Sequence, residues 1–283
     1  MKTLWAAAGT ATVLATLGCS MSDAATVPDC GGGLAATSIG DGTPDPAFDP
    51  SQPQAAGYKM TFDDEFAKLE LASKGTSPGD YTWWPGLWYQ PDKLGEARVS
   101  NGVLTLSDAE LPSMSKDGRH GRDFLFGYFE AELRYAPLDK PDPQHPGVAS
   151  IAWWLYSSAG SFRGAYPFSE LDIQEDFGPS TFTGTVHEWV GAPATDPKSR
   201  TVVRENDNTM LPGKPDQSQW HTYGMLWEKG QVTYYFDRRK VQTVKTFPIN
   251  DVDPVYAILS AQTHMLQVAW VHVWQRRPTC RPY

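Results

Sequence analysis

Short segments in which apolar and polar residues alternate recur from residue 58 onward, and they constrain the fold more than any other feature. The segments that follow this period of two, or that are largely apolar, are residues 126–135, 221–227, 232–236, 241–244, 255–260 and 266–274. Turns separate them in a chain with 25 glycines and 23 prolines, and no segment sustains a helical period. Many short strands at this spacing predict an all-β fold, either a sandwich or a barrel.

Length and charge narrow the class of protein. The 283 residues are enough for one large all-β domain or two small ones. The net charge is −9 and the pI is about 5.1. A nucleic-acid partner needs a basic face, and the chain has no run of lysine and arginine, so no such partner is expected. After the N-terminus, no apolar run approaches the roughly 18 residues that a bilayer-spanning helix needs.

The first 25 residues have the pattern of an export signal, with Lys2 before an apolar region at residues 4–17. Two processing sites compete. Cys19 follows a small residue, as in a bacterial lipoprotein box, whereas residues 22–24 fit an ordinary signal-peptidase site. The sequence therefore predicts an exported protein. It would be extracellular, or held in the cell envelope by a lipid anchor if Cys19 is lipidated. A buried apolar helix at the start of the fold is the alternative.

The cysteines are Cys19, Cys30 and Cys280. Because Cys19 is either lipidated or removed, Cys30–Cys280 is the intramolecular disulfide that the exported chain could form. This bridge would clip the two ends of the mature chain together and close a loop of roughly 250 residues. In the chain-entropy model that is worth about 5 kcal/mol at most. Two free thiols are the alternative.

Residues 26–57 are rich in glycine, proline, alanine, aspartate and serine, and they lack hydrophobic periodicity. We interpret this segment as a linker or as an irregular N-terminal wrap. From residue 58 on, the chain consists of short strands and turns, and a monomer is expected.

Three carboxylates gather in one strand-like segment. Leu171 and Ile173 alternate with Glu170 and Asp172, so the two acids should share one face of a strand. Glu175 would point to the opposite face unless one extra residue, a β-bulge, lies between it and Asp172. With the bulge, the three acids line one cleft, as glycoside hydrolysis requires. The alternative is an acidic strand that faces solvent.

The 11 tryptophans and 12 tyrosines suggest a carbohydrate cleft, because aromatic faces stack on the apolar faces of sugar rings. About half of the tryptophans are expected in the core. Trp153 and Trp154 are adjacent, so one should line the cleft and the other should enter the core. Trp83, Trp84 and Trp88 lie in a loop-like stretch, where at least one is expected to stack on a sugar.

The bulged motif and its surroundings resemble glycoside hydrolase family 16. Its members carry Glu-x-Asp-x-x-Glu in this form, and Glu170, Asp172 and Glu175 match it. The resemblance covers most of residues 60–275. The other matching segments, in the order of the family, are residues 62–66, 97–106, 126–131, 220–227 and 232–237. The resemblance implies a concanavalin A-like jelly-roll β-sandwich with a concave substrate cleft, and residues 58–283 as the catalytic domain.

The resemblance also implies a role for each acid. Glu170 is expected to be the nucleophile of a retaining mechanism, and Glu175 the general acid and then the base. Asp172 lies between them and should orient Glu170 by a shared hydrogen bond. Crowding of like charges should leave one proton on the cluster, and Glu175 is favoured as its holder.

Neighbouring residues are assigned to substrate binding from the same resemblance. The family pattern favours Trp154 over Trp153 for the cleft. His187 and Trp189 lie on the next predicted strand with matching parity, and the family often has a histidine near the acid at this place. A hydrogen-bonded core histidine is the alternative for His187, and His264 is a weaker candidate.

Two departures from the family bear on the substrate and on calcium. Residues 150–154 read Ser-Ile-Ala-Trp-Trp where β-1,3-glucanase members carry Trp-Pro-Ala-Phe-Trp. Residues 155–158 and 168–172 are more similar to members that cut marine galactans such as agarose, porphyran and carrageenan. The prediction therefore leans to a β-galactan, with a β-1,3- or β-1,3-1,4-glucan close behind. Ala269 replaces an aspartate that binds structural calcium in many members, so neither calcium nor another cofactor is expected.

Arg119, His120, Arg122 and Arg163 lie in glycine-containing loops beside the predicted cleft strands. Arginines in such places could hold sulfate esters of a sulfated glycan by bidentate contacts. The alternative is that they are ordinary solvated loop charges.

The sequence as a whole thus predicts an exported endo-β-glycosidase with a polysaccharide substrate. A non-catalytic, lectin-like polysaccharide-binding protein is one alternative, and the presence of all three acids argues against it. A transglycosylase is another, because the same covalent intermediate can pass to a sugar instead of water.

Overall fold

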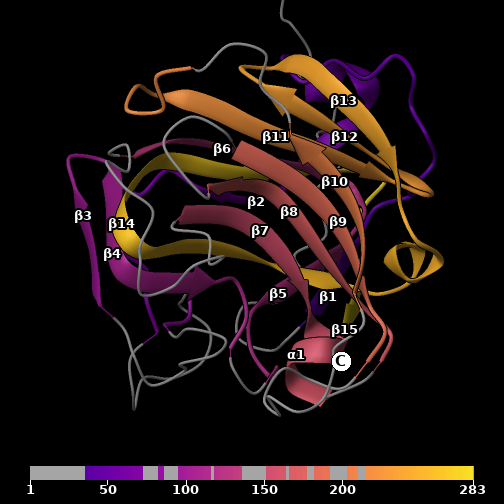
Figure 1. Cartoon of the computed structure of the whole chain (residues 1–283), viewed down its shortest axis with the longest axis horizontal. Coiled ribbons are helices and arrows are strands. Elements are labelled where there is room, and N and C mark those ends of the chain that lie inside the picture. Colours follow the sequence, from indigo (N-terminus) through magenta and orange to yellow (C-terminus); the bar gives the residue numbers. More distant parts are fainter. Residues whose placement is uncertain are drawn as a thin grey trace, which may run out of the picture.

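The computed structural model describes residues 36–72, 82–85, 95–115, 118–135, 151–163, 166–176, 182–191, 203–209 and 215–282, and these are nearly all β-structure (Figure 1). The first strands are β1 (Ala36–Ile39), β2 (Tyr58–Asp64), β3 (Glu96–Ser100), β4 (Val103–Pro112), β5 (Arg122–Leu125) and β6 (Gly127–Tyr135). The next are β7 (Ile151–Ser157), β8 (Phe168–Asp176), β9 (Phe182–Trp189), β10 (Val203–Thr209), β11 (His221–Glu228) and β12 (Gln231–Phe236). The last elements are β13 (Arg239–Lys245), β14 (Val255–Arg276), β15 (Thr279–Pro282), the helix α1 (Ser158–Arg163) and two 3-10 helices, η1 (Pro53–Ala56) and η2 (Pro248–Asp251). The all-β prediction is confirmed.

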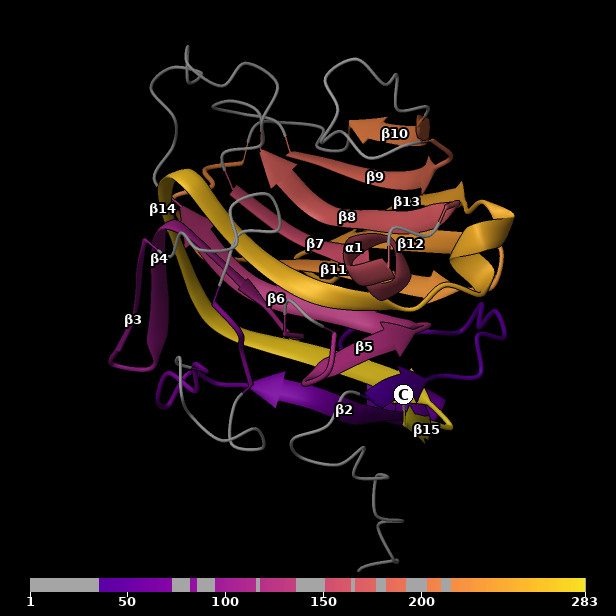
Figure 2. The same ribbon diagram turned by 90° about the horizontal axis from the view of Figure 1, so that it is seen from below.

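One hydrogen-bonded sheet is folded into the two layers of a sandwich. Its main path runs β10-β9-β8-β7-β14-β6-β11-β12-β13. The first part of β14, Val255 to Ala261, pairs with β7, and from Leu266 onward β14 pairs with β6. Figures 1 and 2 show this long yellow strand running along one layer, bending, and returning along the other.

Residues 255–260 and 266–274, predicted as two strands, belong to the single strand β14. The register with β4 shifts between Ala261 and Met265, and the pairing continues on both sides of that shift. An irregularity of this kind bends a strand without ending it. The two predicted strands are therefore the two arms of one bent strand.

Alternation along each strand decides which side chains fill the core between the layers. Leu171 and Ile173 on β8 are buried there, and so is Trp153 on β7. The opposite layer contributes alternate residues of its strands, among them Phe129, Ala131, Tyr223, Met225, Val232 and Tyr234. Residues two apart on β7 and β8 share a face, so the residues between these core positions face the other way, out of the core.

The described part of the N-terminal segment contacts the edge of the sandwich. β1 pairs in parallel with β5 and antiparallel with β15. Arg276 at the end of β14 forms ion pairs with Asp41 and Asp45 of this segment, at 2.9 and 3.3 Å. Cys280 on β15 stands opposite Ser38. Cys30 lies outside the described residues, so the Cys30–Cys280 pairing stays a prediction.

Among the helices in the described ranges, none has the length and apolar character needed to cross a membrane.

Candidate active site

The three acids lie on β8, between β7 and β9. Glu170 pairs with Tyr156 on β7 and with His187 on β9. Asp172 pairs with Trp154 and Thr185 in the same way. Figure 2 shows β8 between these two neighbours.

The β-bulge that the acid spacing requires is present. On β9, the partner of Asp172 is Thr185 and the partner of Glu175 is Thr183. Between these two pairs, β8 therefore contains one more residue than β9. The register with β7 also shifts within this stretch. The extra residue returns Glu175 to the side of Glu170 and Asp172.

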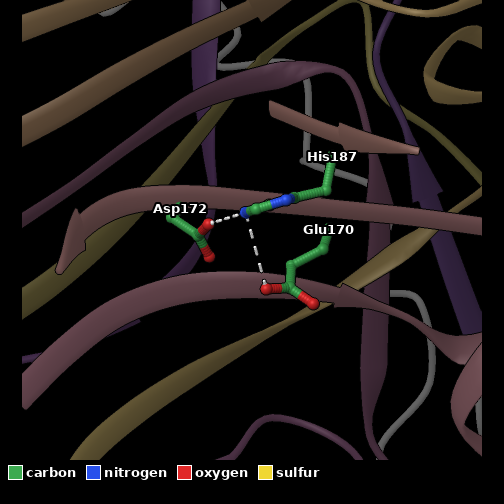
Figure 3. Close-up of side chains that lie close together, drawn as sticks. All are labelled: Glu170, Asp172 and His187. Atoms are coloured by element: carbon green, nitrogen blue, oxygen red, sulfur yellow. Dashed lines mark hydrogen bonds and ion pairs between the residues drawn. The ribbon is translucent and has the colours of Figure 1, made fainter. Parts of the chain in front are cut away.

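Glu170 and Asp172 are closely packed beside His187. The His187 Nε2 atom is hydrogen-bonded to Asp172 Oδ2 at 2.7 Å and lies 3.8 Å from Glu170 Oε1 (Figure 3). The Asp172 side chain is 0% exposed, whereas those of Glu170 and His187 are 13% and 12% exposed. Asp172 is thus the buried member, and Glu170 reaches the surface of the site.

Trp189 holds the other oxygen of Glu170. Its indole Nε1–H donates a hydrogen bond to Glu170 Oε2 at 2.9 Å. The Trp189 ring stacks on Phe168, with centroids 5.7 Å apart and an angle of 14° between the planes. Because the ring is fixed by this stack, the indole N–H is aimed at the carboxylate. A fixed donor of this kind stabilises the ionised form of Glu170.

The electrostatic surroundings of Glu170 oppose its ionisation. Burial and then the adjacent charge of Asp172 raise the pKa of Glu170 well above its ordinary value, and Glu175 acts in the same direction. His187 and the Trp189 N–H lower that pKa. Like charges held this close favour one shared proton, and the expectation that the cluster retains one stays a prediction. The assignment of that proton to Glu175 stays a prediction.

Glu170, Asp172 and His187 also form a set of ligand types that a divalent cation accepts. Their candidate ligand atoms lie within 4.8 Å of one another. The distance of 2.7 Å between His187 Nε2 and Asp172 Oδ2 is that of a hydrogen bond. The expectation that the chain uses no metal or cofactor stays a prediction. For calcium, that expectation rested on Ala269, which replaces a calcium-binding aspartate of many family members.

An aromatic cluster lies beside the acids on the same face of the layer. Its buried members are Trp154, Tyr156, Phe168, Tyr256, Met114, Ala152 and Ile258, with Tyr166 and Trp189 packed against them. The sequence analysis missed Tyr156, Phe168 and Tyr256. Tyr156 and Phe168 could have been found by parity, because each lies two residues from a predicted cleft residue on its own strand.

The structure separates the predicted tryptophans. Trp154 belongs to the aromatic cluster on the face of the acids, whereas Trp153 is fully buried in the core between the layers, so its assignment to substrate binding is wrong. Trp83 is also a core residue, with its Nε1–H bonded to Asp64, and it cannot stack on a sugar. Trp84 is half-buried. Trp88 lies outside the described residues.

The structure gives little support for sulfate binding by the arginines and the histidine that were proposed for it. Arg122 donates a hydrogen bond to the carbonyl oxygen of Thr61 on β2, in the other layer, so it does not serve the cleft. Arg119 is exposed, and the backbone N–H of His120 bonds to a serine hydroxyl. Arg163 ends α1, but its side chain, like that of His264, lies outside what the structure describes.

Fold and site together define a class: a two-layered β-sandwich that carries a bulged, three-carboxylate strand of the glycosidase type. A family model described as "Glycosyl hydrolases family 16" matches residues 92–276. The chain belongs to this family, and the resemblance found in the sequence is confirmed.

Relatives and solved structures agree with this assignment. The endo-1,3-1,4-beta-glycanases ExsH and EglC of Rhizobium meliloti (strain 1021) are 29% and 26% identical over 235 and 239 residues. Each match covers 71% of this chain and 45% of the relative, so the chain spans less than half the length of these proteins. The laminarinase structure from Flavobacterium sp. UMI-01 has a TM-score of 0.54 at 17% identity, covering 77% of this chain and 100% of that one. At this identity, it shows the shared jelly-roll-like fold.

Proposed function

We propose that the chain is a retaining endo-β-glycanase that hydrolyses a polysaccharide with β-1,3 or mixed β-1,3/β-1,4 linkages. The observation that carries the proposal is the bulged strand β8, which presents Glu170, Asp172 and Glu175 to one face. The names of the two Rhizobium relatives support the linkage.

In this proposal, Glu170 attacks the anomeric carbon and Glu175 protonates the leaving oxygen. The covalent glycosyl-enzyme is then released by a water molecule that Glu175, now ionised, deprotonates. Asp172 keeps a buried charge between the two, and His187 holds Asp172 by its 2.7 Å hydrogen bond. The Trp189 N–H fixes Glu170 in position for attack.

A β-galactan is a second candidate substrate. It is favoured by residues 155–158 and 168–172, which are more similar to galactan-cutting members than to β-1,3-glucanases. The sulfated galactans have the weaker case, because Arg122 binds a backbone carbonyl of β2. We favour the glucan because the relatives that match over most of the domain are named for 1,3-1,4 linkages.

A panel of polysaccharides tests the substrate. Purified protein is incubated with laminarin, lichenan, agarose, porphyran and κ-carrageenan, and reducing ends are counted. We expect release from laminarin or lichenan. Release from the galactans alone would replace the glucan by the second candidate, and binding without release would favour a lectin-like protein. With an oligosaccharide of defined length as the substrate, products longer than that oligosaccharide would indicate transglycosylation.

The stereochemistry of the first product tests the mechanism. Proton NMR during hydrolysis should show the β-anomer before mutarotation, because two displacements at one carbon restore its configuration. A first product in the α-form would rule out Glu170 as a nucleophile.

Export is part of the proposal and rests on residues 1–25. Mass spectrometry of the mature protein from its native host distinguishes the two processing routes. A diacylated N-terminal Cys19 supports a lipid anchor, an N-terminus at Ala25 supports a secreted enzyme, and an intact Met1 in the cytoplasm would refute export.

A further inference from the structure

A row of side chains on the substrate face runs from Glu175 to a fourth carboxylate. Glu175 on β8 pairs with Ala152 on β7, Ala152 pairs with Ser260 on β14, and Ser260 pairs with Glu110 on β4. Residues opposite each other on paired strands point to the same face. The neighbours of Glu110 along β4, Ala109 and Leu111, are in the core, so Glu110 faces the substrate side.

Trp154 reaches into this row from the next one. Its register partner on β14 is Ile258, yet its indole Nε1–H donates a hydrogen bond to the Ser260 hydroxyl at 2.8 Å. The indole therefore lies diagonally across the strands. It extends from β7 towards β14, on the side of β7 away from β8, and its Nε1 ends at the Ser260 position of the row.

The contact with Ser260 continues to Glu110. The Ser260 hydroxyl donates to Glu110 Oε1 at 3.0 Å, and Trp154, Ser260 and Glu110 are 7%, 2% and 1% exposed. The direction of this hydrogen-bond chain is fixed. An indole N–H can only donate, so the Ser260 oxygen must accept from it, and the Ser260 proton must go to an acceptor. Glu110 is that acceptor.

Burying a carboxylate is unfavourable unless it is hydrogen-bonded or paired. The proposed hydrolytic mechanism gives the buried Glu110 no chemical task, so its carboxylate needs another explanation. We propose that Glu110 and Ser260 are positioning residues that fix the indole of Trp154 as part of the floor of the cleft, next to the strand that carries Asp172 and Glu175. This inference rests on the proposed function and deepens it. The relay keeps the ring from rotating about its side-chain bonds, so that a sugar meets one preformed surface and loses less freedom on binding.

Kinetics on the substrate that the panel identifies test the role. Ser260→Ala removes the centre of the relay with little change in volume. We expect a rise in KM of roughly fivefold or more, with kcat within about twofold, because binding to the floor is lost while the acids stay in place. Glu110→Leu should behave like Ser260→Ala. Glu110→Gln keeps an acceptor oxygen and should stay within about twofold of the parent enzyme.

The matched control is Ser38→Ala. Ser38 is also a fully buried serine whose hydroxyl bonds to a side chain, Gln275, and it lies on β1, outside the aromatic cluster of the cleft. It should lower thermal stability and leave KM unchanged. Equal changes of KM in Ser260→Ala and Ser38→Ala, or none in either, would overturn the positioning role.

A readout without substrate separates this inference from the proposed function. The indole N–H signal of Trp154, assigned by its loss in Trp154→Phe, should exchange slowly with solvent in the parent protein. It should exchange faster by about tenfold or more in Ser260→Ala, and should remain slow in Glu110→Gln and Ser38→Ala. Fast exchange in the parent protein would refute the relay. If the relay is present but no polysaccharide is cleaved, the proposed function fails instead.

Discussion

Glu130, which is buried, and Glu170, which is 13% exposed, lie on opposite faces of one sandwich, and their partners differ. Glu130 accepts hydrogen bonds from the Arg238 guanidinium at 2.9 and 3.2 Å and from the Tyr128 hydroxyl at 2.7 Å. Glu170 accepts one from the neutral indole of Trp189 and lies beside Asp172 and His187. Both carboxylates are held in place, but only Glu130 has a permanent counter-charge.

In the proposed function, one residue type thus serves structure on one face, as Glu130, and chemistry on the other, as Glu170. The Glu130 carboxylate raises the pKa of Arg238, as expected for a lasting ion pair. Burial and the Asp172 charge raise the pKa of Glu170, which keeps its ionisation responsive to its surroundings. A carboxylate that is positioned but not neutralised can act as a nucleophile.

Exchanging the two glutamates for glutamine should give the largest contrast. Glu170→Gln should lower polysaccharide hydrolysis by roughly a thousandfold or more, because the covalent intermediate cannot form. Glu130→Gln should leave kcat within about twofold and lower the thermal midpoint. Reducing-end assays and thermal unfolding measure both. Glu96→Gln, at an exposed site on β3, is the control and should change neither.

Trp189→Phe should weaken the support of Glu170 while keeping an aromatic ring on Phe168. Losing a hydrogen bond to a charged group costs about 1.5–3 kcal/mol, so we expect a fall in kcat of roughly tenfold to a hundredfold. The N–H lowers the pKa of Glu170, so its removal raises that pKa further. The acidic limb of the kcat/KM profile should then move to higher pH. An unmoved limb would contradict the role of Trp189.

A second pair of carboxylates, Asp123 and Asp253, sharpens the comparison because both are buried and their partners, like that of Glu170, are neutral. Ser158 donates to Asp123 at 2.7 Å, and Ser157 and the backbone N–H of Ser169 donate to Asp253 at 2.9 and 2.7 Å. Burial raises the pKa of Asp123 to about 7 and that of Asp253 to about 6.

These raised pKa values give stability a defined pH dependence. The folded state holds the protons more tightly than the unfolded chain, whose aspartates ionise near pH 4. The contribution is therefore complete below about pH 4 and is lost as pH rises through 6 to 7, by a few kcal/mol. Chemical unfolding between pH 4 and 8 should show that the free energy of unfolding falls as pH rises. The fall should be shallower in Asp123→Asn and in Asp253→Asn than in the parent protein. An unchanged slope in both variants would contradict the assignment.

Arg238→Met should produce the smallest effect. It leaves Glu130 buried without its cation, and because Arg238 is 42% exposed we expect a loss of only about 1–2 kcal/mol in the free energy of unfolding. The double variant Arg238→Met with Glu130→Gln should recover part of it. A drop in kcat for Arg238→Met would show that the two faces are not independent.

Sequence periodicity predicted the strand that carries the three acids because the residues that define this strand are close together in the chain. Glu170, Asp172 and Glu175 lie within six residues, and the alternation of Leu171 and Ile173 fixes the face of the strand. The same alternation separated Trp153 from Trp154. Where local pattern determines geometry, the sequence was sufficient.

Other features depend on pairing between strands far apart in the chain. Glu110, Ser260 and Tyr256 enter the substrate face only through the register of β4 and β14, which no short window contains. Arg122 has a long side chain, and its turn towards Thr61 depends on the position of β2. Residues 255–260 and 266–274 form one strand because the first arm pairs with β7 in one layer and the second arm pairs with β6 in the other.

β14 has a consequence for how the chain folds. It follows β1–β13 in sequence, yet it lies between β7 and β6, where it joins the two layers. During synthesis, β7 and β6 must therefore wait with open edges until β14 emerges, and most of the contacts that complete them are distant in sequence. Such a topology folds slowly and exposes pairing edges meanwhile. Strand β8, which carries the three acids and pairs with β7, therefore reaches its final surroundings only after this late step.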